Sequence, residues 1–412
     1  MKKSLFAIAA VTAFAGAAQA QSSVTVYGLL DYGYAGMSQT SAGTAGAGTT
    51  AQANSVLKTQ NSGFSGNGES TSRLGFRGNE DLGGGTSAFF TAEVALNTDP
   101  TASPQGGLFS TSATGNRQTF LGLAQKGMGR ASVGLQYTPI HNAVGATNAG
   151  GVNNQMGDVI YDRSGNGTAM QASGMSTNDS YTVRTSNALV LNSERIAGFD
   201  ITGMVVSRGT TTTQTAPTTG GQATNSGYGI GINYTWQKLL VTANFQNFKQ
   251  ETASSASATA YTVGYNGGNW TPGTNATDTQ QYYAATYDFG MMKVFAGYIN
   301  RKVINVVNDN QYVARTAQQI GVRAPITPKV QVWASGGMGR INNTGTNGPT
   351  ANFTGWQLGS DYILSKRTNL YAIYGAANTS NATTGSYSAS ATGVANSSFN
   401  QSSYAVGVRH TF

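Results

Sequence analysis

Cysteine is absent from the 412 residues, and charged residues make up only 10% of them. Soluble proteins usually carry about 25% charged residues, so this chain is unusually poor in charge. Intrinsic disorder is also excluded, because disordered chains combine high charge with few aromatics, whereas this one has 20 Tyr and 16 Phe. Small secreted domains rely on disulfides, so a secreted fold without cysteine must be held together in another way.

The chain begins with the features of a secretory signal peptide. A positively charged start is followed by an Ala-rich apolar run over residues 5–18. The small residues Ala18 and Ala20 then form a small-x-small cleavage motif, after which the mature chain starts at Gln21. The run is shorter than the ~20 apolar residues of a transmembrane helix, and no later run approaches that length. We therefore expect a signal peptide over residues 1–20 and one mature domain over residues 21–412.

Gly is abundant, at 55 residues, and the mature sequence repeats one pattern: a stretch of alternating apolar and polar residues, a turn, and another such stretch. Short connections rich in Gly, Pro, Lys and Asp alternate with long ones rich in Thr, Ser, Asn and Gly. The predicted long connections are Gln39–Gly68, Gly209–Ser226, Glu251–Gln280 and Thr379–Ser398. The predicted strands, about sixteen, are 24–34, 71–78, 86–97, 117–126, 131–139, 180–191, 200–208, 227–236, 239–250, 281–288, 291–302, 314–326, 330–341, 352–364, 370–378 and 400–412.

Each predicted strand has one apolar face and one small or polar face. In the last strand Tyr404, Val406 and Val408 alternate with Ala405 and Gly407. Alternation alone fits both a soluble sandwich and a membrane barrel, which turns its apolar face to lipid and its polar face to a wet lumen. The signal peptide, the lack of cysteine and the strand count favour the membrane barrel. We predict an all-β fold, a closed 16-stranded antiparallel transmembrane β-barrel with short periplasmic turns and long extracellular loops.

The mature chain resembles the general porins of Gram-negative outer membranes, particularly those of β-proteobacteria. The resemblance is carried by residues 24–31 (VTVYGLLD), by the highly specific 72–85 (SRLGFRGNEDLGGG), by the pair FLGL and GLQYTP beginning at Phe120 and Gly134, and by the ending VGVRHTF over 406–412. It implies a homotrimer in outer-membrane lipid, with a passive aqueous channel for ions and small hydrophilic solutes. It also implies a third loop folded into the lumen, and a role for Phe412 as the assembly signal.

Arginines on the predicted lumen face are the candidate functional residues. Arg73 and Arg77 share a face because they are four residues apart on one strand, while Leu74 and Phe76 point the other way. A charge facing lipid at the midplane costs about 2–4 kcal/mol, so both arginines are expected in the lumen. The same reasoning places further residues inward. They are Arg117, Arg184, Arg323, Arg409 and Glu93.

The connection from His141 to Ser180 follows the fifth predicted strand, where the resemblance places the folded-in loop. Asp158 and Asp162 are its candidates for the acidic side of a constriction, facing basic residues on the wall. The wall candidates are Arg73, Arg77, Arg117 and Arg184. Charged groups near the narrowest point set ion preference, and the excess of arginine predicts a mild preference for anions. Leu135 stands where relatives often carry Arg, which weakens that preference.

Other classes of function are less well supported. The two histidines, His141 and His410, have no metal-ligand spacing and no neighbouring catalytic set, so we expect neither an enzyme nor a cofactor. The arginines are spread singly, which argues against nucleic-acid binding. Two alternatives remain open. One is a surface-exposed adhesin or antigen barrel, in which the polar loops carry the function instead of the lumen, and the other is a substrate-specific channel. The latter would need aromatics along the lumen, for which Trp333 and Tyr371 are the candidates.

Overall fold

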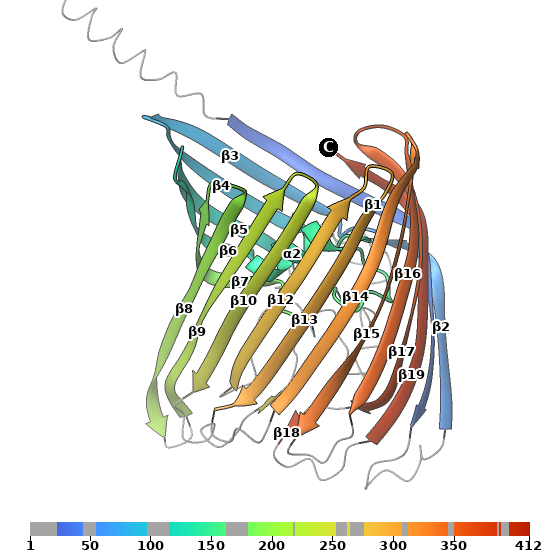
Figure 1. The fold of residues 1–412 in the computed structure, drawn as a ribbon. Helices are drawn as coiled ribbons and strands as arrows, with labels where there is room; N and C mark the ends of the chain where they lie inside the picture. The colour runs from blue at the N-terminus through green and yellow to red at the C-terminus, as the bar shows by residue number, and fades with distance from the viewer. Residues whose placement is uncertain are drawn as a thin grey trace, which may run out of the picture.

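A computed structural model describes residues 23–43, 55–96, 115–161, 180–216, 219–252, 262–263, 276–306, 312–344, 350–384, 387–388 and 395–412. The predicted signal peptide, residues 1–20, lies outside these ranges. The strands form a single antiparallel ring, in which each strand pairs with its neighbours along the chain (Figure 1). Short turns lie at the top of the view, and the strand ends that lead to the long connections lie at the bottom.

The wall has sixteen strand positions, as predicted. One position is shared by two strands in line, since β2 and β3 both pair with β1 on the same side. The strands are β1 (Ser23–Gly43), β2 (Ser55–Gly66), β3 (Arg73–Gly83), β4 (Thr86–Ala95), β5 (Asn116–Gln125), β6 (Gly129–Tyr137), β7 (Arg184–Ser193), β8 (Phe199–Ala216), β9 (Thr219–Trp236), β10 (Leu239–Thr252), β12 (Ala276–Asp288), β13 (Lys293–Asn305), β14 (Tyr312–Thr327), β15 (Val330–Thr344), β16 (Ala351–Ile363), β17 (Thr368–Thr384) and β19 (Ala395–Thr411). A separate two-stranded sheet joins β11 (Thr262–Val263) and β18 (Tyr387–Ser388).

The first and last strands close the ring. β1 pairs with β19 from Leu29↔Thr411 to Gly43↔Ser397. The backbones of Gly28 and Phe412 exchange two hydrogen bonds of 3.1 Å. Closure leaves no sheet edge exposed, which is the condition for a β-sheet to cross a membrane. The cysteine-free fold is therefore held together by its hydrogen-bonded wall.

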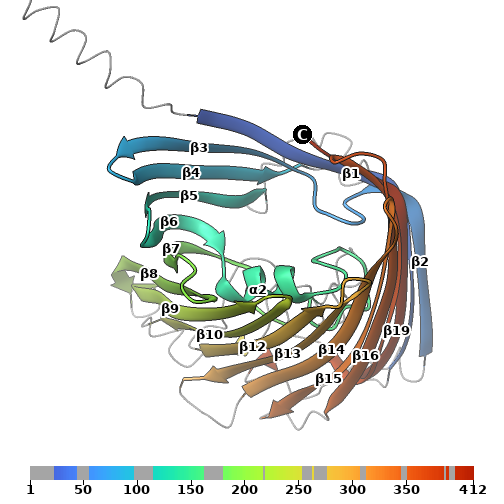
Figure 2. The ribbon, with the colours of Figure 1, turned by 45° about the horizontal axis from the view of Figure 1, so that its top comes forward.

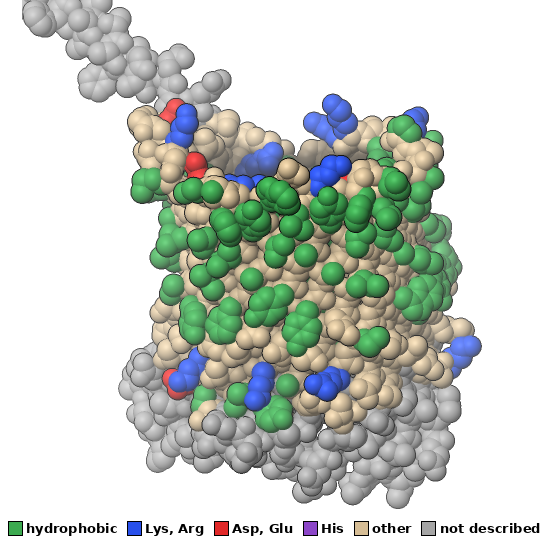
Figure 3. All heavy atoms as spheres, viewed as in Figure 1, with side chains coloured by type: hydrophobic (Ala, Val, Ile, Leu, Met, Phe, Trp, Pro, Cys, Tyr) green, Lys and Arg blue, Asp and Glu red, His purple; other side chains and the backbone are tan. Residues whose placement is uncertain are grey.

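Apolar side chains cover the outer wall in the region between the two rims (Figure 3). Exposed residues such as Leu121, Val205, Ile320 and Leu358 alternate with inward ones along their strands. None of the described helices is long and apolar enough to cross a membrane. In water this apolar surface would be a large exposed patch, so it is suited to contact with lipid hydrocarbon.

Four predicted long connections are partly strand, so their predicted bounds were wrong. β1 and β2 continue their hairpin over Ser38↔Gln60 to Gly43↔Ser55, inside the predicted loop Gln39–Gly68. β8 runs to Ala216 and β17 to Thr384. β10 and β12 likewise extend one or more residues into the predicted loop Glu251–Gln280. These extensions are rich in Thr and Ser, and beyond the lipid a strand no longer needs an apolar face. The alternation used to predict strands therefore ends before the pairing does.

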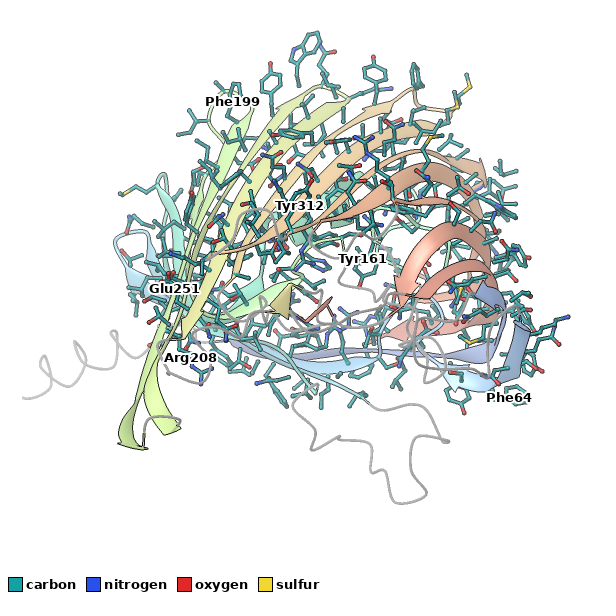
Figure 4. The ribbon with its side chains drawn as sticks, turned by 90° about the horizontal axis from the view of Figure 1, so that it is seen from below. Phe64, Tyr161, Phe199, Arg208, Glu251 and Tyr312 are labelled. Atoms are coloured by element: carbon teal, nitrogen blue, oxygen red, sulfur yellow. The ribbon has the colours of Figure 1, made fainter. Side chains whose placement is uncertain are left out.

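The connection between β6 and β7 folds into the barrel, as the resemblance implied. It starts with α2 (Pro139–Thr147), for which the Thr138 hydroxyl accepts a hydrogen bond from the backbone N–H of His141. We call Thr138–Tyr161 the inner loop. Figure 2 shows α2 inside the ring of strands, and in Figure 4 Tyr161 lies inside while Phe64 lies outside. The core of the molecule forms where the inner loop packs on the wall.

Candidate functional site

Two of the predicted arginines flank an aromatic ring on the lumen face. Pairing of β1 with β3 places Tyr27 opposite Gly75, between Arg73 and Arg77. A Cβ atom at Gly75 would overlap the ring of Tyr27, so glycine is what lets the ring lie across the strand. The guanidinium carbon of Arg77 lies 5.4 Å from the ring centroid, within the range of a cation–π contact.

Glu93 on β4 is the carboxylate around which this group is arranged. It lies opposite Gly75 and is only 4% exposed. The Arg117 Nε donates to Glu93 Oε1 at 2.7 Å, and the Tyr27 hydroxyl donates to Oε2 at 3.1 Å. Arg73 Nη1 lies 4.0 Å from the same carboxylate. Glu93 thus joins side chains from β1, β3 and β5 on the inner side of the wall.

A β-bulge turns Arg117 into the lumen. Glu93 pairs with Gln118 and Val94 with Asn116, so Arg117 is an extra residue in the ladder. Leu121 and Leu123 face outward on the same strand, and strict alternation would put Arg117 on their side. A bulge re-aims a side chain in this way. Arg117 thus lies on the inner side through the bulge and not through simple alternation, and its part in a constriction stays a prediction.

Arg184 completes the group from β7. Its Nη1 donates to the Arg117 carbonyl at 3.4 Å, and its guanidinium carbon lies 5.8 Å from the centroid of Tyr137. The Tyr137 hydroxyl accepts from Arg117 Nη2 at 2.7 Å. The structure thus brings the four predicted wall arginines into one group. Arg73 and Arg117 lie beside the Glu93 carboxylate, whereas Arg77 contacts Tyr27 and Arg184 contacts Arg117. We call this group, Arg73, Arg77, Arg117 and Arg184 with Glu93, the basic wall.

Asp158 does not face the basic wall. It is 2% exposed, and its Oδ1 accepts from the backbone N–H groups of Ile160 and Tyr161, both at 2.8 Å. Its Oδ2 accepts from the Asn148 side chain. Burial raises the pKa of Asp158, while these donors oppose the rise. Asp158 therefore orders the inner loop, and a part in conduction stays a prediction. Asp162 lies outside the described residues.

The inner loop is fastened to the wall formed by β14, β15, β16 and β17, which we call the loop-bearing wall. Gln357 donates to the carbonyls of Gln155 and Met156 at 2.7 and 2.6 Å. Arg323 Nε donates to the Ala149 carbonyl at 2.9 Å, and Arg315 Nη2 to the Val159 carbonyl at 2.9 Å. Arg323, predicted only as a lumen residue, thus has a defined role in holding the loop.

Sequence reasoning missed Arg315 and Gln357, although a signal was available. Arg315 is eight residues from Arg323, and Gln357 lies four residues from Asp361, so each shares the inward face of its strand. Gly375 is a second missed contact. A Cβ atom there would overlap the Met156 carbonyl, so the loop backbone rests directly on the strand.

A third group of titratable residues lies where β2 ends and β3 begins. The Asp31 carboxylate accepts from the Tyr371 hydroxyl at 2.6 Å and from the Glu69 backbone N–H at 2.8 Å. Asn369 Nδ2 donates to Glu69 and to Asp361, at 3.1 and 3.2 Å. Within the described ranges, no group of three or more His, Cys, Asp or Glu side chains is arranged to hold a metal ion.

The remaining predicted site residues lie at the short-turn end. Arg409 Nη1 donates to the Asn369 side chain at 3.4 Å, which places Arg409 beside the Glu69 and Asp361 carboxylates. The ring of Phe412 occupies the space above Gly28, where a Cβ atom would overlap it. Its role as an assembly signal stays a prediction.

Comparisons with known proteins agree with this geometry. A family model described as Gram-negative porin matches residues 7–382. An outer membrane porin protein of Bordetella pertussis is 40% identical over 139 residues, 33% of this chain and 34% of that protein. Outer membrane porin protein 32 of Delftia acidovorans is 46% identical over 95 residues, 23% of this chain and 22% of that protein. The chain therefore matches about a quarter to a third of the length of these curated relatives.

Solved structures share the fold across the whole barrel. An anion-selective porin from Comamonas acidovorans is 20% identical with a TM-score of 0.61, covering 95% of this chain and 100% of that one. OmpT of Vibrio cholerae is 16% identical with a TM-score of 0.56, covering 95% and 98%. The barrel, its apolar outer surface and these relatives place the chain in the outer membrane of Gram-negative bacteria. Because the family model spans most of its length, the chain belongs to the Gram-negative porin family.

Proposed function

We propose that the chain forms a passive, water-filled diffusion channel for ions and small hydrophilic solutes, with a mild preference for anions. The observation that carries this proposal is the basic wall, a group of four arginines with one carboxylate, in which two of the arginines, Arg73 and Arg117, lie within 4.0 Å of that carboxylate. A unit charge about 4 Å from an ion changes its energy by about 1 kcal/mol in water. An excess of cations at the lumen surface therefore favours anions several-fold. The fold neighbour described as an anion-selective porin supports the same preference for anions over cations.

The inner loop is proposed to narrow the lumen opposite the basic wall. Its bonds to Gln357, Arg323 and Arg315 hold it on the loop-bearing wall. In this arrangement Asp158 acts by fixing the loop, and Asp162 remains the candidate for the acidic side of the constriction. Charges on two facing surfaces would orient and select ions as they pass.

Assembly as a homotrimer in outer-membrane lipid is part of the proposal. A structure of the fold neighbour OmpT from Vibrio cholerae is described as a trimer form. Porin-family membership favours a channel over an enzyme, so no catalytic role is proposed.

A substrate-specific channel with an aromatic track is not favoured by the described lumen. Trp333 and Tyr371 do point inward, as the sequence analysis allowed, but they are 5% and 4% exposed. Trp333 lies against Gly150 of the inner loop, and Tyr371 is bonded to Asp31. Neither ring offers an open face along which a sugar could slide.

Planar-bilayer conductance with the reversal potential under a KCl gradient tests the function. The double variant Arg77→Gln/Arg184→Gln removes two cations that make no ion pair with Glu93. We expect stepwise currents from the wild type and a several-fold lower anion/cation permeability ratio from the variant. Lys329→Gln/Lys366→Gln, which removes two exposed cations at the short-turn rim, is the matched control and should change little. Stable insertion without current, or equal shifts in both variants, would contradict the proposal.

A further inference from the structure

Tyr137 lies where the wall of the barrel passes into the inner loop. It is the last residue of β6, and the next residue, Thr138, begins the inner loop and caps α2, which lies beside the end of this strand (Figure 2). Tyr137 pairs with Arg184 across β6 and β7. The Thr138 N–H donates to the Val183 carbonyl at 3.1 Å, which fixes the backbone on the loop side as well. The side chain of Tyr137 therefore starts from a fixed point between the basic wall and the inner loop.

Tyr137 contacts two arginines of the basic wall, each in a different way. Its hydroxyl accepts a hydrogen bond of 2.7 Å from Arg117 Nη2, and the Arg184 guanidinium carbon lies 5.8 Å from the centroid of its ring. The first contact is with a neutral oxygen, and the second is a cation–π contact with the negative face of the ring. The two guanidinium groups repel one another because they carry the same charge. Tyr137 opposes this repulsion without adding a negative charge, so the group keeps its positive charge.

The ring of Tyr137 also packs on the inner loop. The ring of His141, in the first turn of α2, has its centroid 4.3 Å from that of Tyr137. His141 in turn contacts Tyr161 and Tyr181, with ring centroids 5.9 Å away in each case. Tyr161 and Tyr181 belong to the buried cluster on which Tyr137 packs. Because these rings are in contact, a displacement of the inner loop would displace the ring of Tyr137 as well.

We propose that Tyr137 is a positioning residue: it transmits the position of the inner loop to Arg117 and Arg184, and so affects the anion preference without carrying a charge. The inference rests on the proposed function, in which the basic wall acts on passing ions. Without the ring, Arg184 loses a partner, and repulsion from Arg117 moves the two cations apart. A guanidinium that moves from about 4 to about 8 Å from the ion path loses half of its effect on an anion, which changes the permeability ratio about two-fold.

Reversal potentials under a KCl gradient, measured on the purified protein in planar bilayers, test the inference with variants that leave the charge of the channel unchanged. Tyr137→Leu removes the ring and the hydroxyl, and should lower the anion/cation permeability ratio about two-fold. Tyr137→Phe removes the hydroxyl alone. It should lower the ratio by less, because the ring still lies against Arg184.

Tyr282→Phe is the matched control for a loosened loop. The Tyr282 hydroxyl on β12 lies 2.7 Å from Thr147 Oγ1 at the end of α2, so this variant also removes one hydrogen bond between the wall and the inner loop. Thr147 keeps its bond to the Ala143 carbonyl, also 2.7 Å long. Among the described residues, no hydrogen bond or ring contact joins Tyr282 to an arginine of the basic wall. The permeability ratio of Tyr282→Phe should therefore equal that of the wild type.

Repeating the measurements in Arg184→Gln separates the two contacts. The ring then has no cation to hold, so Tyr137→Leu should lower the ratio no further than Tyr137→Phe does in that background. The inference is overturned if Tyr137→Leu keeps the ratio of an anion-preferring wild type, if Tyr282→Phe lowers it as much as Tyr137→Phe, or if the loss in Tyr137→Leu is the same in both backgrounds. A wild type without current or without anion preference would contradict the proposed function itself, and the inference would fall with it.

Discussion

Arginine serves opposite purposes on the two sides of this lumen. On the basic wall, Arg77 is exposed and the side chain of Arg73 keeps 25% of its exposure. On the loop-bearing wall, Arg315 is fully buried and donates to the backbone of the inner loop, while Arg323 is partly buried and does the same. The residue type and the inward direction are the same. What differs is accessibility to water, which Arg77 and Arg73 keep, whereas Arg117 on the basic wall and Arg315 on the loop-bearing wall are enclosed.

This comparison separates two contributions that a lumen-facing charge can make. A charge that is enclosed by protein and bonded to it holds the bonded segments in place. Its partners compensate the charge. A charge that faces water acts on whatever passes. Inward orientation alone therefore does not identify a residue that sets ion selectivity. The exposure of the side chain and its bonding partners determine whether its charge can act on permeating ions.

The largest effect is expected from breaking either of two buried ion pairs, Glu93–Arg117 on the basic wall or Asp278–Arg301 between β12 and β13. Glu93→Gln removes the partner of Arg117, and Asp278→Asn removes the partner of Arg301, which lies 2.6 Å away. Breaking a buried pair leaves an uncompensated charge and costs on the order of 3–5 kcal/mol. Both variants should therefore lose stability in urea unfolding in micelles. Only Glu93→Gln should also raise the anion/cation permeability ratio, by up to about five-fold.

The two variants are controls for one another. Asp278 is 0% exposed and Arg301 is 4% exposed. Glu93 is equally enclosed at 4%, but it lies 4.0 Å from Arg73, whose side chain keeps 25% of its exposure, so its loss leaves an accessible cation uncompensated. A change of selectivity in Asp278→Asn equal to that in Glu93→Gln would show that exposure does not separate the two roles.

A smaller effect is expected from pushing the inner loop off the loop-bearing wall. A side chain at Gly375 must displace the Met156 carbonyl, and overpacking of this kind costs about 1–3 kcal/mol. Gly375→Val should therefore shift the loop into a less defined position and raise single-channel conductance. Gly203→Val is the matched control, because a Cβ atom at Gly203 has nothing within 4 Å. Unchanged conductance in Gly375→Val would mean that the loop does not limit flow.

The fold could be predicted from the sequence because the membrane imposes a regular pattern. Within the lipid every strand must alternate, so the strand order, the sixteen positions and the closure by residues 400–412 were all predicted and are confirmed. Outside the lipid the constraint disappears. The pairing of Ser38–Gly43 with Ser55–Gln60 was missed because these residues, mostly Ser, Thr, Gln and small side chains, do not alternate between an apolar and a polar face.

The site could be predicted only in part. The arginines of the basic wall were found because a charge on the lipid face is costly, and that rule needs no knowledge of neighbours. Which arginine remains accessible depends on the path of the inner loop, which is set by contacts far apart in sequence, such as Gln357 with Met156. The enclosure of Asp158 follows from the same packing. The alternation of apolar and polar residues along one strand contains no information about the enclosure of Asp158.

The smallest effect, a pH dependence, concerns Glu69, which lies beside the Asp31 and Asp361 carboxylates. Burial, with the neighbouring Asp361 carboxylate as the second cause, raises the pKa of Glu69 to about 7. Asp31 also raises it, and Arg409 opposes the rise. Glu69 is therefore neutral below that pH and negative above it. A negative charge in the lumen lowers the preference for anions, so the anion/cation permeability ratio should fall as the pH rises through about 7.

The expected change is roughly two-fold, because a charge more than about 10 Å from the ion path is largely screened at 0.1 M salt. Reversal potentials measured from pH 5.5 to 8.5 check it. Glu69→Gln should give a flat profile at the high anion preference. Asp361→Asn should move the midpoint to lower pH, since it removes the second cause of the raised pKa. A midpoint near 7 that survives Glu69→Gln would show that Glu69 is not the group whose titration changes the selectivity.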